Sequence, residues 1–274
     1  MPMLKDKEKI KIAVAGKGDV GKDGGRGRMK KTITLKEHII NYAKNKRYFN
    51  ITDLKKYFAE RGIDFKNDTL KKYLYLLKKE NFIYGAGRGW YSTIKDEFEL
   101  DTKPVEEIIA LIKDEFPLLD FSCWGTEQIK GFYHHLPSQF VTFVYADKDF
   151  LQALKDFMAD NGYNTYLNPR KSETEKYVEL KNQTVILRPF ISSREPKNLR
   201  LAKIEKILVD LLMETKRVNL MDMGECQKII SNIRLNYRIN MAEMFDYAER
   251  RKIKEDMWNM CTNQNPPMSH FCKM

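Results

Sequence analysis

The segment 30–95 constrains the fold most, because it combines three helical patterns with two short aromatic-rich runs around a glycine turn. A first helix is expected after Thr34, a residue type that caps helix N-termini. A second is expected from Thr52 to Gly62, where glycine tolerates a left-handed cap. A third is expected over about 69–80, after cap chemistry at 67–69. Its apolar stripe, at helical spacing, consists of Leu70, Tyr73, Leu74 and Leu77.

The aromatic runs 82–84 and 90–92 flank the glycine-rich segment 85–89 and predict a β-hairpin. Three helices followed by a hairpin is the order of a winged helix-turn-helix, whose third helix enters the DNA major groove. A docking module for proteins and a merely solvated lysine face are the alternative interpretations. In the DNA-binding interpretation, the third helix and the hairpin tip supply the contacts, through Thr69, Lys71, Lys72, Tyr75, Lys78, Lys79 and Arg88.

The net positive charge of the chain is confined to its first third. The net charge is +11, yet residues 1–95 hold 24 Lys and Arg against 10 Asp and Glu, and residues 96–274 hold 25 against 28. A basic module joined to a slightly acidic one predicts a polyanion partner, here double-stranded operator DNA. Lysines bind phosphates as point charges, so they favour affinity over sequence specificity, and the operator sequence is not predicted.

Other properties limit the class of protein. The 274 residues are 42% hydrophobic, enough for a packed core, and no apolar run approaches the ~20 residues of a membrane span. Residues 1–10 lack the apolar stretch of a secretory signal. The four cysteines are widely scattered, which favours a reducing cytoplasm over a disulfide framework.

Residues 16–22 contain most of a Walker A phosphate loop and resemble the deviant loop of MinD/ParA-type ATPases. Two aspartates oppose a nucleotide site: Asp23 replaces the Ser or Thr that would bind magnesium, and Asp19 replaces a loop glycine. Moreover, ~25 residues cannot build the surrounding parallel sheet. We interpret residues 1–29 as a disordered leader, with Met29 a natural start.

The rest of the chain is expected to form a linker at 96–103, an α/β domain at 104–258 and a flexible tail at 259–274. Helices are expected at 104–115, 126–135 and 147–161, and four to five strands within 118–124, 140–145, 163–167, 177–180 and 184–189. From 199 onward the pattern is helical, with helices over about 201–212, 222–236 and 241–260. The predicted fold class is α+β: an N-terminal winged helix-turn-helix followed by an α/β domain with a helical C-terminal bundle.

This second module resembles the AbiEi family of bacterial antitoxins. Because these antitoxins also begin with a winged helix, the similarity extends over about 34–254. The resemblance rests on Trp-Gly-Thr at 124–126, Leu-Pro-Ser-Gln-Phe at 136–140, and Ser-Arg-Glu-Pro at 193–196 ahead of a helix with Glu205 and Leu-x-Asp-Leu at 208–211. It implies that the first domain binds operator DNA and represses its own operon. It also implies that the second domain opposes a nucleotidyltransferase-type toxin, directly or indirectly.

Catalytic patterns are weak. Nucleotidyltransferase chemistry needs a Gly-Ser turn followed by paired aspartates, and the sequence lacks that pattern. Asp120 with Glu179 would suit a metal-dependent nuclease if adjacent strands carried them, but an alternating strand explains the same residues. Glu205 and Asp210 are interpreted as a salt-bridged helix surface. We expect no enzyme activity, cofactor or metal; a transcription regulator without a toxin and the nuclease remain alternatives.

Histidines and cysteines give only loose metal patterns. His134 and His135 are adjacent, so on a helix their side chains would point apart. Cys261, His270 and Cys272 lack the close cysteine spacing of zinc sites.

Overall fold

The computed structural model describes residues 33–192 and 194–262. Contacts divide the chain into two units, Met1–Ile33 and Thr34–Met274, and every element below belongs to the second unit. The phosphate-loop segment, the leader predicted at 1–29, and His270 and Cys272 lie outside the described residues. Within the described ranges, no helix has the length and apolar character needed to cross a membrane.

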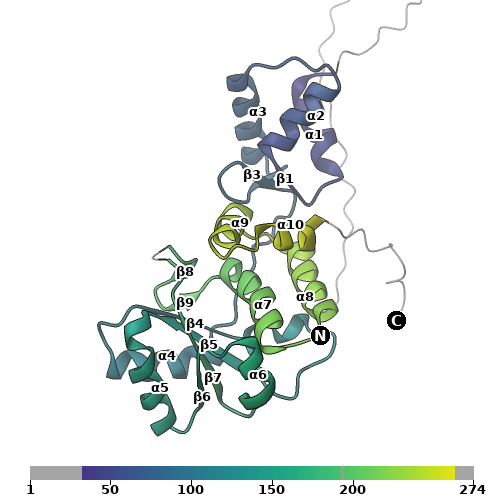
Figure 1. Cartoon of the computed structure of the whole chain (residues 1–274). Coiled ribbons are helices and arrows are strands. Elements are labelled where there is room, and N and C mark those ends of the chain that lie inside the picture. Colours follow the sequence, from purple (N-terminus) through teal and green to yellow (C-terminus); the bar gives the residue numbers. More distant parts are fainter. Residues whose placement is uncertain (1–32, 193, 263–274) are drawn as a thin grey trace, which may run out of the picture. The chain divides into compact units, whose positions relative to one another are not determined.

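The first part of this unit, residues 34–95, is called the basic unit below (Figure 1). Its elements are α1 (Leu35–Lys44), β1 (Tyr48–Asn50), α2 (Ile51–Glu60), α3 (Asn67–Lys79), β2 (Tyr84–Gly85) and β3 (Trp90–Ser92). The strands form an antiparallel sheet in the order β1-β3-β2. Three helices and a hairpin follow one another as the sequence predicts, and β1 is an addition that the sequence analysis missed.

Local chemistry explains where these helices begin. Thr34 and Glu37 form a capping box at α1, as the Thr34 prediction requires. α2 begins at Ile51 instead of Thr52, because the side chain of Asn50 accepts a hydrogen bond from the backbone N–H of Asp53 at 2.8 Å. α3 begins at 67 without a side-chain cap, so the cap predicted at 67–69 is wrong.

The second part contains a six-stranded sheet in the order β6-β7-β5-β4-β9-β8, one strand more than expected. Its strands are β4 (Phe121–Gly125), β5 (Val141–Ala146), β6 (Asn164–Leu167), β7 (Thr184–Pro189), β8 (Lys197–Asn198) and β9 (Leu201–Ala202). β5, β6 and β7 are mutually parallel, while β4 is antiparallel to β5. The helices among them are α4 (Lys103–Glu115), η1 (Thr126–Phe132), η2 (Lys148–Phe150), α5 (Leu151–Asp160) and α6 (Lys171–Tyr177).

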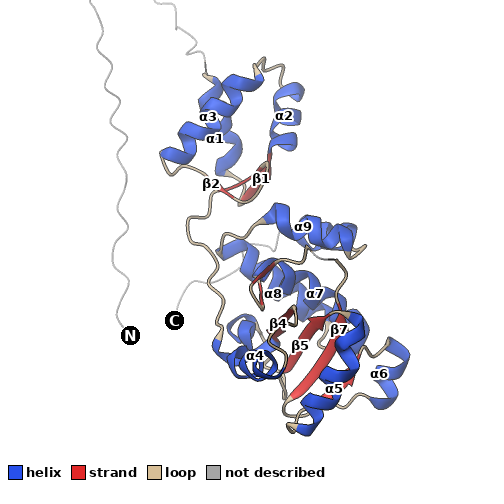
Figure 2. Ribbon diagram, turned by 90° about the vertical axis from the view of Figure 1, so that its left-hand side faces the viewer, coloured by secondary structure: helices blue, strands red, loops and turns tan. Residues whose placement is uncertain are grey.

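Alternate residues of the central strands face different cores, because strand side chains alternate between faces. Val144 and Leu187 belong to the core that α4 and α5 complete. Tyr145 and Ile186 belong to the core formed with α7 (Ile204–Val218), α8 (Met223–Asn236), α9 (Met241–Arg250) and α10 (Lys254–Thr262). The sheet is therefore covered on both faces, and α+β with a helical C-terminal region describes the fold (Figure 2).

Several local predictions are wrong. The strand predicted at 177–180 is absent, because α6 continues to Tyr177 and the following segment binds Tyr166, whose hydroxyl accepts from the N–H of Glu179 at 3.0 Å. The segment 126–132 is a 3₁₀ helix, shorter than the helix predicted at 126–135. The helix predicted at 241–260 is broken at Lys252, which has a left-handed φ of 60°. Residues 259–262 belong to α10 instead of a tail.

Candidate functional site

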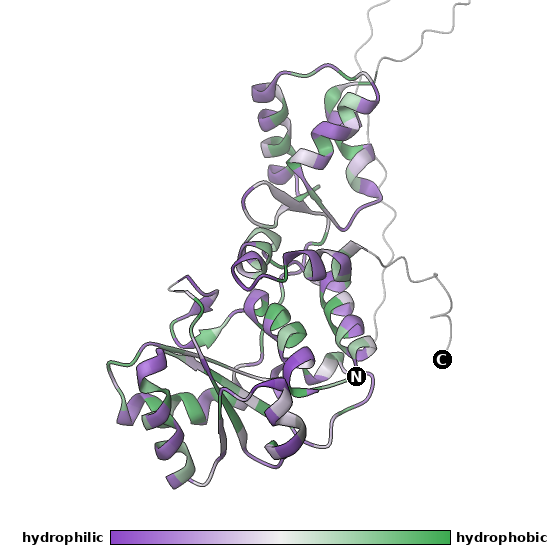
Figure 3. Cartoon of the chain, viewed as in Figure 1, coloured by the Kyte–Doolittle hydropathy of each residue, from purple (hydrophilic) through white to green (hydrophobic). Residues whose placement is uncertain are grey.

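The outward face of α3 gathers most of the residues predicted to bind DNA. Leu70, Leu74 and Leu77 are buried in the core of the basic unit. On the opposite side of the helix, Tyr75 is 63% exposed. The exposed cations of the same helix are Lys71, Lys72, Lys78 and Lys79. Thr69 is half-buried in the first turn, and Figure 3 shows hydrophilic residues along α3.

The lysines of this face are nearly free of acidic partners. Lys71 lies 3.5 Å from Asp68, but both side chains are more than 70% exposed, so the pair contributes little. Within the described residues, Lys72, Lys78 and Lys79 make no ion pair with an acidic side chain. α3 therefore presents several uncompensated positive charges around one exposed aromatic ring.

Arg88 lies elsewhere. It occupies the turn 86–89 between β2 and β3, called the wing tip below, and this turn packs on α9. A Cβ placed on Gly87, whose φ is +100°, would clash with Asn240 and come 2.6 Å from the Cβ of Ala242. Arg88 lines a hollow of about 450 Å³ with Asp53 of α2 and with Asp246 and Glu249 of α9. The structure thus separates Arg88 from the α3 lysines and places it near carboxylates.

An aromatic cluster holds the wing tip on the helical region. The ring centroid of Trp90 lies 5.5 Å from that of Phe245 and 6.2 Å from that of Trp258. Near by, the N–H of Ala242 donates to the carbonyl of Ala86 at 3.4 Å. Figures 1 and 2 both show α9 beside the sheet of the basic unit.

The predicted linker 96–103 takes part in the same contact. Phe98 donates its N–H to the carbonyl of Arg238, and Arg238 donates its N–H to the carbonyl of Asp96. The guanidinium of Arg238 also pairs with Glu97 at 3.0 Å. The segment is therefore bound along the turn between α8 and α9, and its low hydropathy gave no sign of these contacts.

A buried charge cluster, defined here by six side chains, lies between the sheet and the helices α7 and α9. Arg188 on β7 pairs with Glu214 on α7 at 2.5 Å. Lys206 on α7 pairs with Glu195 at 2.7 Å and with Asp210 at 2.8 Å. Arg251, directly after α9, lies 3.3 Å from Asp210. The three positive and three negative groups of this cluster are Arg188, Lys206, Arg251, Glu195, Asp210 and Glu214.

Two tyrosines complete the cluster. The ammonium of Lys206 lies 3.4 Å from the ring centroid of Tyr145 and donates to the hydroxyl of Tyr247 at 2.9 Å. Tyr247 in turn donates to Asp210 at 3.0 Å. Burial, reinforced by Asp210, raises the pKa of both tyrosines well above the ordinary value. Burial alone would lower the pKa of Arg251, but Asp210, Tyr145, Tyr247 and Glu214 together outweigh burial and raise that pKa.

The interpretation of Glu205 and Asp210 as a helix surface is wrong. Asp210 is buried in the charge cluster. The carboxylate of Glu205 is also buried and accepts the N–H of Asn240 at 2.7 Å, at the start of α9. Burial raises the pKa of Glu205, and the Asn240 hydrogen bond opposes that rise. The helical period of α7 could not predict that these residues are buried, because nearly the whole helix is buried, charged positions included.

The structure does not bring together the two nuclease candidates. Asp120 precedes β4 at the edge where β5 and β7 end, and it pairs with Lys197. Glu179 pairs with Lys181 at 2.5 Å and lies beside Asn164, where β6 begins. They therefore lie at opposite ends of the strands, and two strands separate β4 from β6.

The other metal candidates are also dispersed. His134 and His135 contact each other at 3.0 Å in a segment that is not helical, and Cys261 is buried, which raises the pKa of its thiol to about 11. Among the described residues, no group of three or more His, Cys, Asp or Glu side chains is arranged to hold a metal.

Fold and charges together define a mixed α+β protein in which an exposed lysine-rich helix and a buried charge cluster belong to one compact unit. Residues 69–267 match the model of a family described as a family of unknown function, DUF6577. Because the match spans more than half of the chain, the protein belongs to this family. The matched segment begins within α3 and includes the whole sheet and the C-terminal helices. A comparison with curated proteins gave no match.

Proposed function

We propose that the protein is a bacterial DNA-binding antitoxin that represses its own operon and counteracts a nucleotidyltransferase-type toxin. In this proposal the basic unit is a winged helix-turn-helix that binds operator DNA in the cytoplasm. The second domain acts on the toxin, directly or indirectly, and the protein performs no catalytic step of its own. The observation that carries the DNA-binding half is the exposed lysine face of α3, where the described residues provide one ion pair, the exposed Lys71–Asp68 contact.

The physical basis is charge neutralisation on a helix that fits the major groove. The groove is ~12 Å wide and admits an α-helix, whose outward side chains reach base edges and phosphates. Each lysine that neutralises a phosphate steepens the salt dependence of the logarithm of affinity by about 0.9. The four lysines of α3 would therefore give a slope of roughly −3.6. The exposed ring of Tyr75 lies among them and supplies a hydroxyl for phosphate or base contact.

The toxin-related half rests on the resemblance to AbiEi antitoxins. Two of the motifs that carry it meet in the buried charge cluster, because Glu195 of the Ser-Arg-Glu-Pro loop and Asp210 of the Leu-x-Asp-Leu helix both pair with Lys206. A shared ionic contact explains why these residue types would occur together. The family match also includes α3 from residue 69 onward, together with the second domain, in one segment, which supports a function that uses both.

The test compares two matched charge reversals. We would titrate the full chain, Lys71→Glu/Lys72→Glu, and Lys113→Glu/Lys171→Glu against DNA from upstream of its own gene and against unrelated DNA, at two salt concentrations. Lys113 and Lys171 are exposed on α4 and α6 and change the net charge equally. The α3 variant should lose operator binding by about 100-fold or more, whereas the control should bind nearly as the wild type. Equal losses in the two variants would contradict an α3 interface.

A growth assay separates an antitoxin from a regulator without a toxin. A neighbouring nucleotidyltransferase gene would be expressed with the wild type or with Lys71→Glu/Lys72→Glu. We expect both proteins to restore growth, because DNA binding and toxin control depend on different domains. Failure of the wild type to protect would reject the antitoxin half and leave the regulator.

A further inference from the structure

A crevice opens where the parallel strands β5 and β7 end. The two strands are neighbours, but the chain leaves them in opposite directions. After β5 it enters α5, on the face that also carries α4, and after β7 it returns to α7 on the other face. In open sheets, ligands bind at such a switch point, outside the carboxyl ends of the strands.

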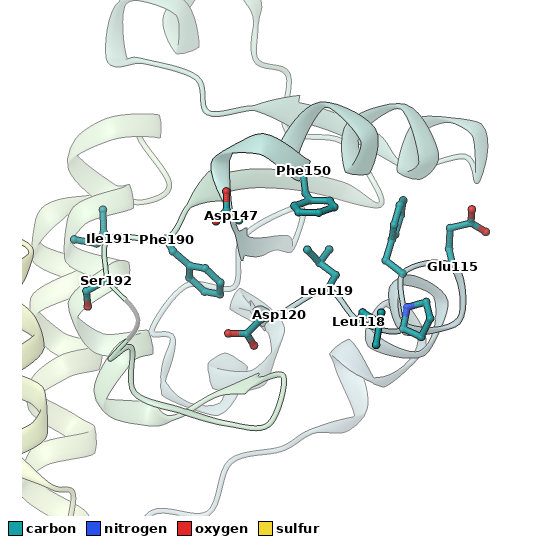
Figure 4. Close-up of a pocket in the computed structure, with 11 residues that line it drawn as sticks. Glu115, Leu118, Leu119, Asp120, Asp147, Phe150, Phe190, Ile191 and Ser192 are labelled. Carbon is teal, nitrogen blue, oxygen red and sulfur yellow. The ribbon is translucent and has the colours of Figure 1, made fainter.

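The crevice is a cavity of about 790 Å³, within the range of ~300–1,000 Å³ typical of small-molecule sites. Its wall is mainly apolar. Phe150 follows β5, Phe190 follows β7, and Leu119 precedes β4. Figure 4 shows these three side chains around one space, with Asp120 and Asp147 near by and Glu115 at its other end.

The charged side chains of the wall all have one sign. Glu115, Asp120 and Asp147 line the cavity, and no lysine or arginine of the described residues does. Lys197 of β8 is not among the lining residues, but it already pairs with one of these carboxylates. Its ammonium pairs with Asp120 and lies 4.8 Å from the ring centroid of Phe190. A carboxylate beside an aromatic face is an arrangement that binds ammonium and guanidinium groups.

The wall is held in place without a ligand. Phe190 donates its N–H to the carbonyl of Ala146 at 2.9 Å, and Ile191 donates its N–H to Glu195 at 3.1 Å. Because Glu195 is anchored in the buried charge cluster by Lys206, the loop after β7 has a fixed attachment. A preformed cavity lowers the entropic cost of binding.

We infer that this cavity binds a small organic cation: an ammonium or guanidinium group on an aromatic or branched aliphatic body. The apolar body fills the space between Phe150, Phe190 and Leu119. The cation faces Asp147 and shares Asp120 with Lys197. A small molecule is favoured over a protein segment, because among the described residues the exposed apolar side chains at the mouth are Pro117, Leu118, Phe150 and Ile191. These four residues are far fewer than the ~20–30 that each partner contributes to a stable interface. The inference does not depend on DNA binding.

The test uses three probes of one shape: tryptamine, a cation; tryptophol, which is neutral; and indole-3-propionate, an anion. Each is titrated into the full chain by calorimetry, with ligand-detected NMR for weak binding. We expect tryptamine to bind about tenfold more tightly than tryptophol, and no binding of the anion. No saturable binding of tryptamine with a dissociation constant below about 1 mM, or equal binding of all three probes, would overturn the inference.

Variants locate the site. Asp120→Asn/Asp147→Asn keeps the size of both side chains and one acceptor oxygen on each, but removes both negative charges. It should weaken tryptamine binding about tenfold and leave tryptophol binding unchanged. Asp156→Asn/Asp160→Asn, at two exposed positions of α5, is the matched control and should change neither. Phe190→Ala should weaken both probes, because it removes part of the apolar wall. Tryptamine binding that survives the double substitution would place the cation elsewhere and reject the site.

Discussion

On α3, the side chains of four lysines and Tyr75 reach solvent, whereas the six charged side chains of the buried charge cluster are each less than a tenth exposed. Among the described residues, the α3 lysines have one acidic partner, Asp68 beside Lys71, whereas every group of the cluster has at least one partner of opposite charge. Charge on α3 costs little to maintain, since water solvates it. The buried side chains of the cluster stay charged only because each has an oppositely charged partner that compensates for its lost hydration.

The difference separates two uses of the same residue types. An unpaired surface lysine is available to an external anion, so substitution should change binding and leave folding nearly unaffected. A paired, buried lysine is unavailable to any partner, so substitution should change folding first. The following experiments test whether this separation is complete.

The largest effect is expected in the buried charge cluster. Lys206→Met keeps the length of the side chain but leaves Glu195 and Asp210 without their shared cation, and the cluster with one net negative charge. The free energy of unfolding should fall by about 3–5 kcal/mol, as when one member of a buried ion pair is removed. Urea unfolding measures it, with Lys72→Met on α3 as the matched control, which should be nearly silent. If Lys206→Met lowers the free energy of unfolding as little as Lys72→Met does, the charge cluster and α3 do not differ in this respect.

The wing tip gives the next largest effect. Gly87→Ala places a Cβ against Asn240 and Ala242 at a positive φ, so we expect a loss of about 1–3 kcal/mol. Gly85→Ala, two residues earlier, meets nothing within 4 Å and should stay within about 0.5 kcal/mol of the wild type. If both variants unfold at the same urea concentration, the wing tip does not pack on α9 in solution.

A smaller effect separates the two ends of the basic unit. Lys78→Ala should reduce the salt slope of operator binding by about 1, because it removes one phosphate contact. Arg88→Ala should leave the slope nearly unchanged, because Arg88 lies in the hollow with Asp53, Asp246 and Glu249. Salt titrations of affinity measure both. A larger change for Arg88 than for Lys78 would show that the wing tip leaves α9 to contact DNA.

The smallest effect concerns pH. Because the pKa of Glu205 is raised in the folded chain, native Glu205 keeps its proton at pH values where the unfolded chain has released it. The associated stability is present at low pH and lost as pH rises through the folded pKa. Glu205→Gln lacks this loss and can still accept the N–H of Asn240. Its stability relative to the wild type should therefore rise between about pH 4 and about pH 7, which urea unfolding at both pH values would measure. A constant difference would contradict the raised pKa.

The sequence predicts the basic unit better than the second domain, and the reason is physical. The stripe Leu70, Leu74 and Leu77 alternates with exposed lysines, so helical period alone reveals which face of α3 is buried. In α7, both apolar and charged residues are buried, so period does not distinguish Asp210 from a surface aspartate. Its partner Lys206 is one turn away on the same helix, but Tyr247 and Arg251 reach Asp210 only because α9 packs on α7.

The candidate sites follow the same pattern. The α3 lysines could be named from the sequence, because a solvated face needs no distant partner. The separation of Asp120 from Glu179 depends on strand order, and the position of Arg88 depends on the packing of a glycine turn on α9. Neither strand order nor packing at a distance is encoded in local spacing.

The contact at the wing tip bears on where this chain can be cut. A fragment ending near Lys95 would keep Trp90 but lose Phe245 and Trp258, the rings that cover it. A fragment starting near Pro104 would uncover the other side of the same aromatic cluster and leave the main chain of Arg238 without the Asp96 and Phe98 partners. Each half would expose an apolar surface that favours aggregation, so residues 34–262 should be expressed together as a single fragment.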